Sequence, residues 1–160
     1  MLPHATSQTI QRQGSSRAER PSARRSAAGG SLALSGVVVL IVEDDPDSRE
    51  MLATILEAAG ALVQRADSAQ AGFESLLKDI PDLIVSDIAM PNEDGYSFVR
   101  RVRGLESEAA GVPAIALTAF CSDDAKHKAA SAGFSLHLGK PVDAVALVAA
   151  AARLTQPRNA

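Results

Sequence analysis

The chain has few of the residues that mark secreted, membrane-spanning or aromatic-rich proteins. Only 3% of its 160 residues are aromatic, none is Trp, and Cys121 is its single cysteine. One cysteine excludes an intrachain disulfide and is typical of a reducing compartment, so we expect a cytoplasmic protein. The apolar run 32–42 is too short to cross a bilayer, so no membrane partner is expected.

Charge is divided unevenly along the chain. Residues 1–36 hold five Arg and one Glu, a net charge of +4, which leaves −7 on the remainder. An acidic folded part argues against nucleic acid as the main partner. Residues 1–35 are rich in Ser, Ala, Arg, Gln and Gly, and they contain too little apolar surface to offset the entropy of ordering. We therefore predict a disordered extension over 1–35, one domain over 36–155 and a short tail over 156–160.

From Gly36 onward, short aliphatic runs alternate with amphipathic segments. Runs rich in Val, Ile and Leu predict buried strands, and Asp45, Ser68 and Ser122 are suitable helix N-caps. The expected strands are 37–42, 61–65, 83–86, 112–117 and 134–138. The expected helices are 46–59, 69–77, 96–103, 123–132 and 143–154. Five strand–helix units predict a single α/β domain with a doubly wound parallel sheet.

Polar residues follow four of these strands. They are the acidic run 43–45, Asp87, Thr118 and Lys140. The carboxyl ends of parallel strands share one edge of the sheet, so these side chains should converge. Acidic oxygens without a neighbouring His or Cys favour Mg²⁺ over zinc. Taken singly, the acids could be a solvated turn with Asp45 as a helix cap.

Asp87 has the position of a nucleophile. Its carboxylate could attack a phosphoryl group to form an acyl phosphate, while Mg²⁺ and the Lys140 ammonium neutralise the phosphoryl oxygens. The Thr118 hydroxyl could donate a hydrogen bond to the same group. Singly, these residues could also be a turn Asp, a surface Lys and a strand-end Thr.

Four segments together resemble the receiver domain of two-component response regulators. They are LIVEDDPDSRE, LIVSDIAMPNEDGY, AIALTAF and HLGKPVD, in the family's order and spacing, and the resemblance covers about residues 36–154. It implies a five-stranded flavodoxin-like sheet of order 2-1-3-4-5 with helices on both faces. It also implies a phosphoacceptor switch rather than a classical enzyme, with Asp87 taking phosphate from a histidine kinase or histidine phosphotransfer protein.

The resemblance also implies a role for individual residues. Asp44 would bind Mg²⁺ directly, Glu43 would help through water, and Asp87 and the backbone carbonyl of Ala89 would complete the protein ligands. Thr118 and Lys140 would contact the phosphoryl group, and the Lys140–Pro141 peptide bond would be cis.

The sequence departs from the family pattern at the switch. The family couples Thr118 to an aromatic ring on the fifth strand, and the residue at that position is His137. A histidine could still move between buried and exposed states and add pH sensitivity, or it could be a tolerated rim residue. Ala89 and Phe120 occupy positions that influence hydrolysis in the family, and they offer no polar group to orient water. We therefore expect a fairly long-lived acyl phosphate.

Other functions fit the sequence less well. An FMN-binding relative would need a Gly/Ser/Thr-rich phosphate loop where residues 43–45 are acidic, and an Asp-nucleophile phosphatase would need a second Asp two residues after Asp87. The remaining alternative is a receiver-like scaffold that binds a partner without being phosphorylated. Six residues follow Leu154, so we expect output by protein contact through the fourth helix, fifth strand and fifth helix. A shuttle, a sink, an effector and a receiver detached from a hybrid kinase all remain open, as do a monomer and a phosphorylation-dependent dimer.

Overall fold

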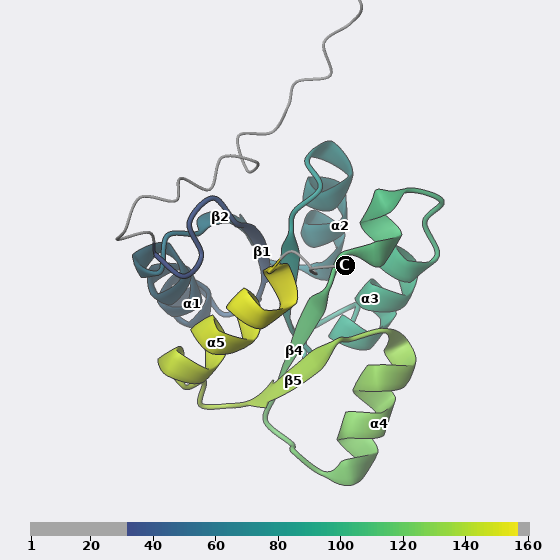
Figure 1. Ribbon diagram of the computed structural model, residues 1–160. Coiled ribbons are helices and arrows are strands. Elements are labelled where there is room, and N and C mark those ends of the chain that lie inside the picture. Colours follow the sequence, from purple (N-terminus) through teal and green to yellow (C-terminus); the bar gives the residue numbers. More distant parts are fainter. Residues whose placement is uncertain (1–31, 157–160) are drawn as a thin grey trace, which may run out of the picture.

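The computed structural model describes residues 32–156, and its centre is a parallel five-stranded sheet (Figure 1). The strand order is β2-β1-β3-β4-β5, which confirms the predicted topology. The strands are β1 (Val38–Val42), β2 (Leu62–Ala66), β3 (Leu83–Asp87), β4 (Ala114–Thr118) and β5 (Leu136–Gly139). Most of the predicted extension, residues 1–31, and the tail residues 157–160 lie outside the described residues.

Helices cover both faces of the sheet. They are α1 (Pro46–Ala58), α2 (Ala69–Lys78), α3 (Gly95–Arg103), α4 (Asp123–Ala132) and α5 (Ala144–Thr155). Helices α1 and α5 lie together on one face, and α2, α3 and α4 lie on the other (Figure 1). Between residues 32 and 156, every helix is too short or too polar to span a lipid bilayer.

Each of these helices begins at a side-chain cap. An Asp or Ser oxygen accepts a hydrogen bond from a backbone N–H of the first turn, which satisfies a donor that the helix itself leaves unpaired. The capping residues are Asp45, Ser68, Asp94, Ser122 and Asp143. The Asp45 carboxylate accepts from the Ser48 amide at 2.9 Å, as the Asp45-Pro46 pair predicts. These local caps explain why the helix starts could be read from the sequence.

The core consists of two aliphatic clusters separated by the sheet. Successive residues of β3 alternate between them: Ile84 packs with α2, α3 and α4, whereas Leu83 and Val85 pack with α1 and α5. Because both faces are covered, β3 and β4 are buried along their whole lengths. With both faces covered, polar side chains can gather at the carboxyl edge of the sheet, where β1, β3 and β4 end.

The structure differs from the prediction at several places, among them the start of β4 at Ala114 rather than at residue 112. Residues 32–35, which composition assigned to the extension, belong to the fold because Leu34 is fully buried and its N–H bonds to the Ala59 carbonyl at 2.8 Å. Strand β5 begins at Leu136 rather than at Phe134, whose ring packs edge-on against Tyr96. A short 3₁₀ helix, η2 (Glu108–Gly111), was not predicted.

Candidate functional site

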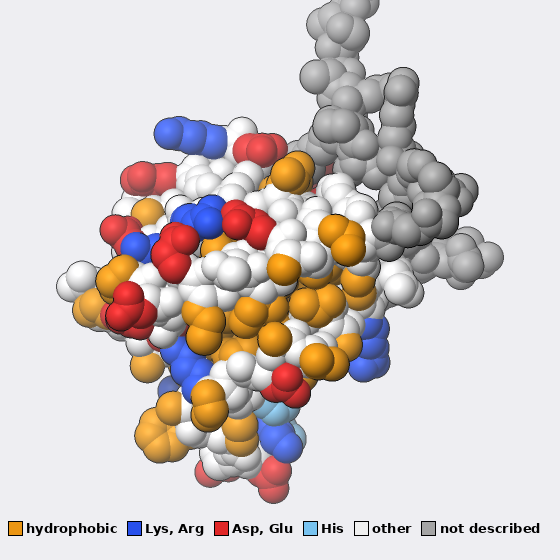
Figure 2. Space-filling model, turned by 90° about the vertical axis from the view of Figure 1, so that its left-hand side faces the viewer, with side chains coloured by type: hydrophobic (Ala, Val, Ile, Leu, Met, Phe, Trp, Pro, Cys, Tyr) orange, Lys and Arg blue, Asp and Glu red, His pale blue; other side chains and the backbone are white. Residues whose placement is uncertain are grey.

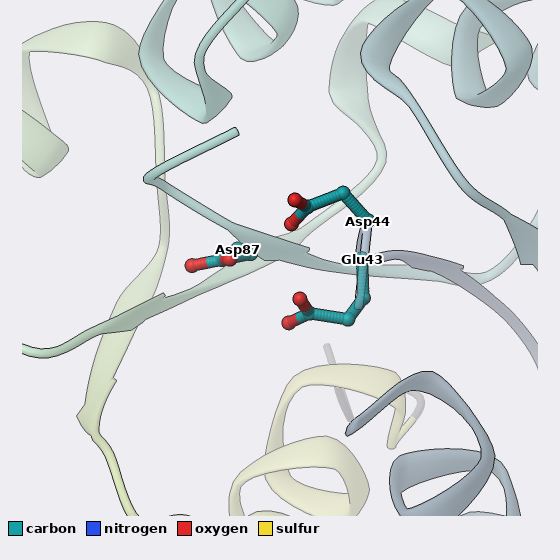
Figure 3. A group of neighbouring side chains, drawn as sticks. All are labelled: Glu43, Asp44 and Asp87. Atoms are coloured by element: carbon teal, nitrogen blue, oxygen red, sulfur yellow. The ribbon is translucent and has the colours of Figure 1, made fainter. Parts of the chain in front are cut away.

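Three carboxylates meet at the carboxyl edge of the sheet. Glu43 and Asp44 follow β1, and Asp87 is the last residue of the neighbouring strand β3. One oxygen from each lies within 4.8 Å of the others, and the side chains of Glu43 and Asp44 reach toward the side of Asp87 (Figure 3). Glu43 is 1% exposed and Asp87 is 5% exposed, whereas Asp44 is half-buried. The predicted acidic cluster is therefore assembled, with two of its members almost removed from water.

Lys140 joins this cluster from the other end of the chain. It follows β5, and its backbone N–H donates to the Thr118 carbonyl at 2.8 Å. Its Nζ lies 3.1 Å from Glu43 Oε2 and 3.2 Å from Asp87 Oδ2, so one ammonium bridges two buried carboxylates. The Lys140–Pro141 peptide bond is cis, as the resemblance implies.

The charges at this edge alter one another's pKa values. Burial raises the pKa of Glu43 and the nearby charge of Asp87 raises it further, against the lowering effect of hydrogen bonds from the Asp45 amide and from Lys140. Burial opposes the charge of Lys140, but its hydrogen bond to Glu43 and the charge of Asp87 outweigh burial, so its pKa is raised. Lys140 is therefore a cation at neutral pH, and three acids face one base.

The Thr118 hydroxyl lies at the end of β4 and is bound to the loop that follows. Its Oγ1 donates to the Phe120 carbonyl and accepts from the Phe120 amide, each at 3.0 Å. Phe120 itself is 77% exposed. His137 is half-buried on β5, opposite Ala116 of β4. Thr118 thus connects the sheet edge to the β4–α4 loop, and His137 lies one strand away.

The loop after β3 brings the main chain to Asp87. The Ala89 amide donates to Asp87 Oδ1 at 3.3 Å, and the exposed Ala89 stands at the rim. Sequence reasoning missed the role of Gly95, whose N–H donates to the Ile88 carbonyl at 2.9 Å. A Cβ on Gly95 would lie 2.3 Å from the Asp87 carbonyl oxygen, so a side chain does not fit there. The signal available in the sequence was the glycine directly after Glu93 and Asp94, in the loop that follows Asp87.

Arg49 is a second residue that the sequence did not single out. From the first turn of α1, its guanidinium donates to the Glu43 carbonyl at 2.9 Å. This contact holds the backbone of the β1–α1 loop where Glu43 and Asp44 leave the strand. Arg49 therefore helps to position the stretch of backbone that carries the two acids.

The donor set suits a small hard cation. Glu43, Asp44 and Asp87 offer oxygens only, and burial of two of them concentrates negative charge that a divalent ion would neutralise. The remaining Lys140 ammonium suits an anionic oxygen, and Asp87 is the carboxylate common to both groups. The edge could therefore hold a divalent cation and a phosphoryl group side by side.

Comparison with known families agrees with this arrangement. A sequence model of the response regulator receiver domain matches residues 39–152. The chain belongs to the response regulator receiver domain family. This confirms the resemblance carried by the four sequence motifs and, with the observed strand order, the receiver fold.

Two relatives of very different length are similar to this chain. The chain is 42% identical over 110 residues to a 14.6 kDa protein of the sodA1 3′ region of Leptolyngbya boryana, covering 69% of this chain and 83% of that one. It is 38% identical over 117 residues to hybrid signal transduction histidine kinase D of Dictyostelium discoideum, covering 69% of this chain but 8% of the kinase. The similar region therefore makes up most of a small protein in one case and a small part of a hybrid kinase in the other.

One solved receiver bears on the acidic cluster. The receiver domain of the sensor histidine kinase PA1611 from Pseudomonas aeruginosa, with a magnesium ion coordinated in its active site cleft, superposes with a TM-score of 0.69. It is 28% identical to this chain, and the match covers 74% of this chain and 97% of that one. In this chain, the cluster of Glu43, Asp44 and Asp87 is a group of carboxylates that could hold a metal ion.

Proposed function

We propose that this receiver accepts a phosphoryl group on Asp87, with Mg²⁺ bound beside it, and signals through protein contacts. The observation that carries the proposal is the position of the Asp87 carboxylate. It is 5% exposed, lies 3.2 Å from the Lys140 ammonium, and shares a 4.8 Å cluster with Glu43 and Asp44. A merely structural aspartate in a turn would not need this concentration of charge.

The transfer step follows from these neighbours. A carboxylate oxygen of Asp87 attacks the phosphorus atom of a phosphohistidine in a histidine kinase or phosphotransfer protein. A new O–P bond forms while the P–N bond breaks, and the departing imidazole takes up a proton. Lys140 stabilises the negative charge on the phosphoryl oxygens throughout, because its raised pKa keeps it protonated.

The acidic residues would hold the metal. Asp44 and Asp87 would bind it directly with the Ala89 carbonyl, and Glu43 would help through water. When bound, Mg²⁺ supplies neutralisation of the phosphoryl oxygens that the Lys140 ammonium alone does not provide. Fully ionised acids without it would carry more negative charge than Lys140 offsets.

Thr118 would pass the change to the surface. Turning its Oγ1 toward a phosphoryl oxygen on Asp87 would break both hydrogen bonds with Phe120. The β4–α4 loop would then be free to rearrange, next to the α4, β5 and α5 surface where we place the downstream protein partner. The side chain of His137 on β5 would change position with this loop. The apolar side chains of Ala89 and Phe120 offer no group to orient water, so the acyl phosphate should be long-lived.

Beryllofluoride with Mg²⁺ tests the assignment directly, because it takes the place of a phosphoryl group on an Asp carboxylate. Amide chemical shifts of the full chain and of Asp87→Asn would be followed by NMR during titration. We expect metal-dependent shifts that spread from Asp87 through Thr118 to His137 and are absent in Asp87→Asn. A Ser75→Ala variant, on α2, is a matched control that should respond like the unmodified protein.

Phosphoramidate offers a covalent test with a P–N donor. Intact mass spectrometry should detect one added phosphoryl group on the unmodified chain and none on Asp87→Asn. If Asp87→Asn incorporated phosphate normally, the site assignment would be wrong. Failure of the unmodified chain in both experiments would instead favour a scaffold that binds its partner without phosphorylation.

A further inference from the structure

Phe120 exposes a large apolar side chain near the carboxyl edge of the sheet. It is 77% exposed and lies in the loop between β4 and α4, two residues after Thr118 (Figure 1). Hydrophobic side chains also reach the surface on the side of α1 and α5, where Figure 2 shows many of them gathered together with charged side chains around them. Phe120 belongs to a different part of the surface, the loop that directly follows the site residue Thr118.

An apolar cavity of about 300 Å³ opens beside this loop. Ile88 and Ala89 line it from the loop after β3, Tyr96 lines it from α3, and Ala125 lines it from α4. Phe120 stands at its border. An apolar cavity of about 150 Å³ is enough to bind a benzene molecule, so this cavity has room for a phenyl side chain.

Tyr96 gives the cavity an aromatic wall. Tyr96 is 8% exposed, and its ring already packs edge-on against Phe134 with the two ring centroids 6.5 Å apart. The Lys128 ammonium lies 4.8 Å from the centroid of the Tyr96 ring. A second ring that entered the cavity would meet Tyr96, and aromatic pairs at such separations are stabilised beyond the burial of their area.

Thr118 fixes the backbone of Phe120. Both polar backbone groups of Phe120 are bound to the one Thr118 hydroxyl, each at 3.0 Å. Further along the loop, the Cys121 sulfur lies close over Gly139, since a Cβ on that glycine would be 2.8 Å from it. Only Ala119 and Phe120 lie between these two attachments, so a change at Thr118 acts mainly on the position of Phe120.

We propose that Phe120 moves its ring from solvent into this cavity when Thr118 turns toward a phosphoryl group on Asp87. The proposal rests on the phosphoacceptor function proposed above and adds where the released loop goes. Breaking both hydrogen bonds to Thr118 frees the backbone of Phe120, and removal of the ring from water then favours the closed position. Phe120 is thus a positioning residue, which holds the loop where Thr118 faces the phosphoryl group.

Ring burial and phosphoryl binding therefore favour the same position of the β4–α4 loop. Two events that share one conformation stabilise each other by the same factor. Complete burial of a Phe side chain changes an equilibrium constant by about tenfold or more. Loss of the Phe120 ring should weaken binding of a phosphoryl analogue at Asp87 by a similar factor.

A single Trp at this position tests the movement, because the chain contains no other. The full chain carrying Phe120→Trp would be titrated with beryllofluoride and Mg²⁺, while the Ala89 amide shift reports binding at Asp87. We expect the Trp emission to move to shorter wavelength and its quenching by iodide to fall. Adding Ala125→Leu, which fills the cavity, should abolish the emission shift. Adding Leu77→Ala, at a 57% exposed site on α2, should leave it unchanged.

The unmodified chain gives a check that does not depend on a Trp side chain. Nuclear Overhauser contacts between the rings of Phe120 and Tyr96 should appear when beryllofluoride and Mg²⁺ are added. Phe120→Ala should raise the beryllofluoride concentration at half-saturation at least about tenfold. Leu77→Ala is again the control and should keep the concentration of the unmodified chain.

The readouts separate failure of this proposal from failure of the phosphoacceptor function. If the Ala89 amide responds while neither the Trp emission nor the ring contacts change, Asp87 stays the phosphoacceptor and the movement of Phe120 is refuted. An emission shift that Ala125→Leu does not reduce would place the ring outside the cavity and overturn the proposal too. No response of the Ala89 amide, the emission or the ring contacts would refute the phosphoacceptor function, and this proposal with it.

Discussion

Replacing Asp87 with Asn should stabilise the metal-free protein. The change keeps the volume of the side chain and removes one of three clustered carboxylates. One oxygen of Asp87 lies within 4.8 Å of an oxygen of Glu43 and of Asp44. At that largest separation and an effective dielectric of about 20, each like-charge pair repels by about 3.5 kcal/mol. The attraction of Asp87 to Lys140 at 3.2 Å is about 5 kcal/mol on the same scale. Repulsion is thus the larger effect by about 2 kcal/mol, and water at the half-buried Asp44 reduces the difference to about 1–2 kcal/mol.

Urea unfolding followed by circular dichroism measures this difference, with chelator or with Mg²⁺ present. We expect Asp87→Asn to raise the free energy of unfolding by about 1–2 kcal/mol in chelator. The unmodified protein should gain stability with Mg²⁺ through ligand linkage, and the variant should gain less because one ligand is gone. The two proteins should therefore approach each other in stability as Mg²⁺ is added.

A control variant distinguishes repulsion within the carboxylate cluster from the effect of removing any one negative charge. Asp67 is exposed just after β2, at the same edge of the sheet, and Asp67→Asn should change the free energy of unfolding by no more than about 0.5 kcal/mol. If Asp87→Asn were less stable than the unmodified protein in chelator, attraction to Lys140 would outweigh the repulsion. The account of the cluster as a strained, cation-seeking site would then be refuted.

Three further predictions concern the surroundings of the site. Gly95→Ala should lower the free energy of unfolding by about 3 kcal/mol in a urea titration, because its Cβ would lie 2.3 Å from the Asp87 carbonyl oxygen. Gly111→Ala is the control: a Cβ there meets open space, so this variant should unfold like the unmodified protein. Arg103→Met should lower the free energy of unfolding by about 2 kcal/mol, because the half-buried guanidinium donates hydrogen bonds to two backbone carbonyls that would lose their partner. Slower amide hydrogen exchange at the end of α4 would contradict this prediction. The raised pKa of Glu43 means that the folded protein binds its proton more tightly than the unfolded chain. Metal-free stability should therefore gain a contribution from Glu43 as pH falls through its folded pKa toward 4.5, and this gain should vanish in Glu43→Gln, which pH-dependent melting would test.

Local signals in the sequence were enough to place most of the elements. Aliphatic runs predicted the strands, and caps such as Asp45 and Ser68 predicted the helix starts, because a cap depends on a few neighbouring residues. The boundaries that failed depend on distant contacts. Leu34 is ordered because it enters the core beside α1, and Phe134 leaves the strand because its ring meets Tyr96 of α3.

By itself, the sequence determined the alternation of strands and helices and the residues that follow each strand. Parallel strands end at one edge, so the convergence of Asp87, Thr118 and Lys140 could be predicted from order alone. Only the tertiary structure decided that Lys140 bridges Asp87 and Glu43, which lies 97 residues before it in the chain, and that Gly95 has no room for a side chain. It also decided which face of the apolar helix α5 stays open, because that depends on where α1 and the sheet pack, and packing is set by contacts that no local pattern encodes.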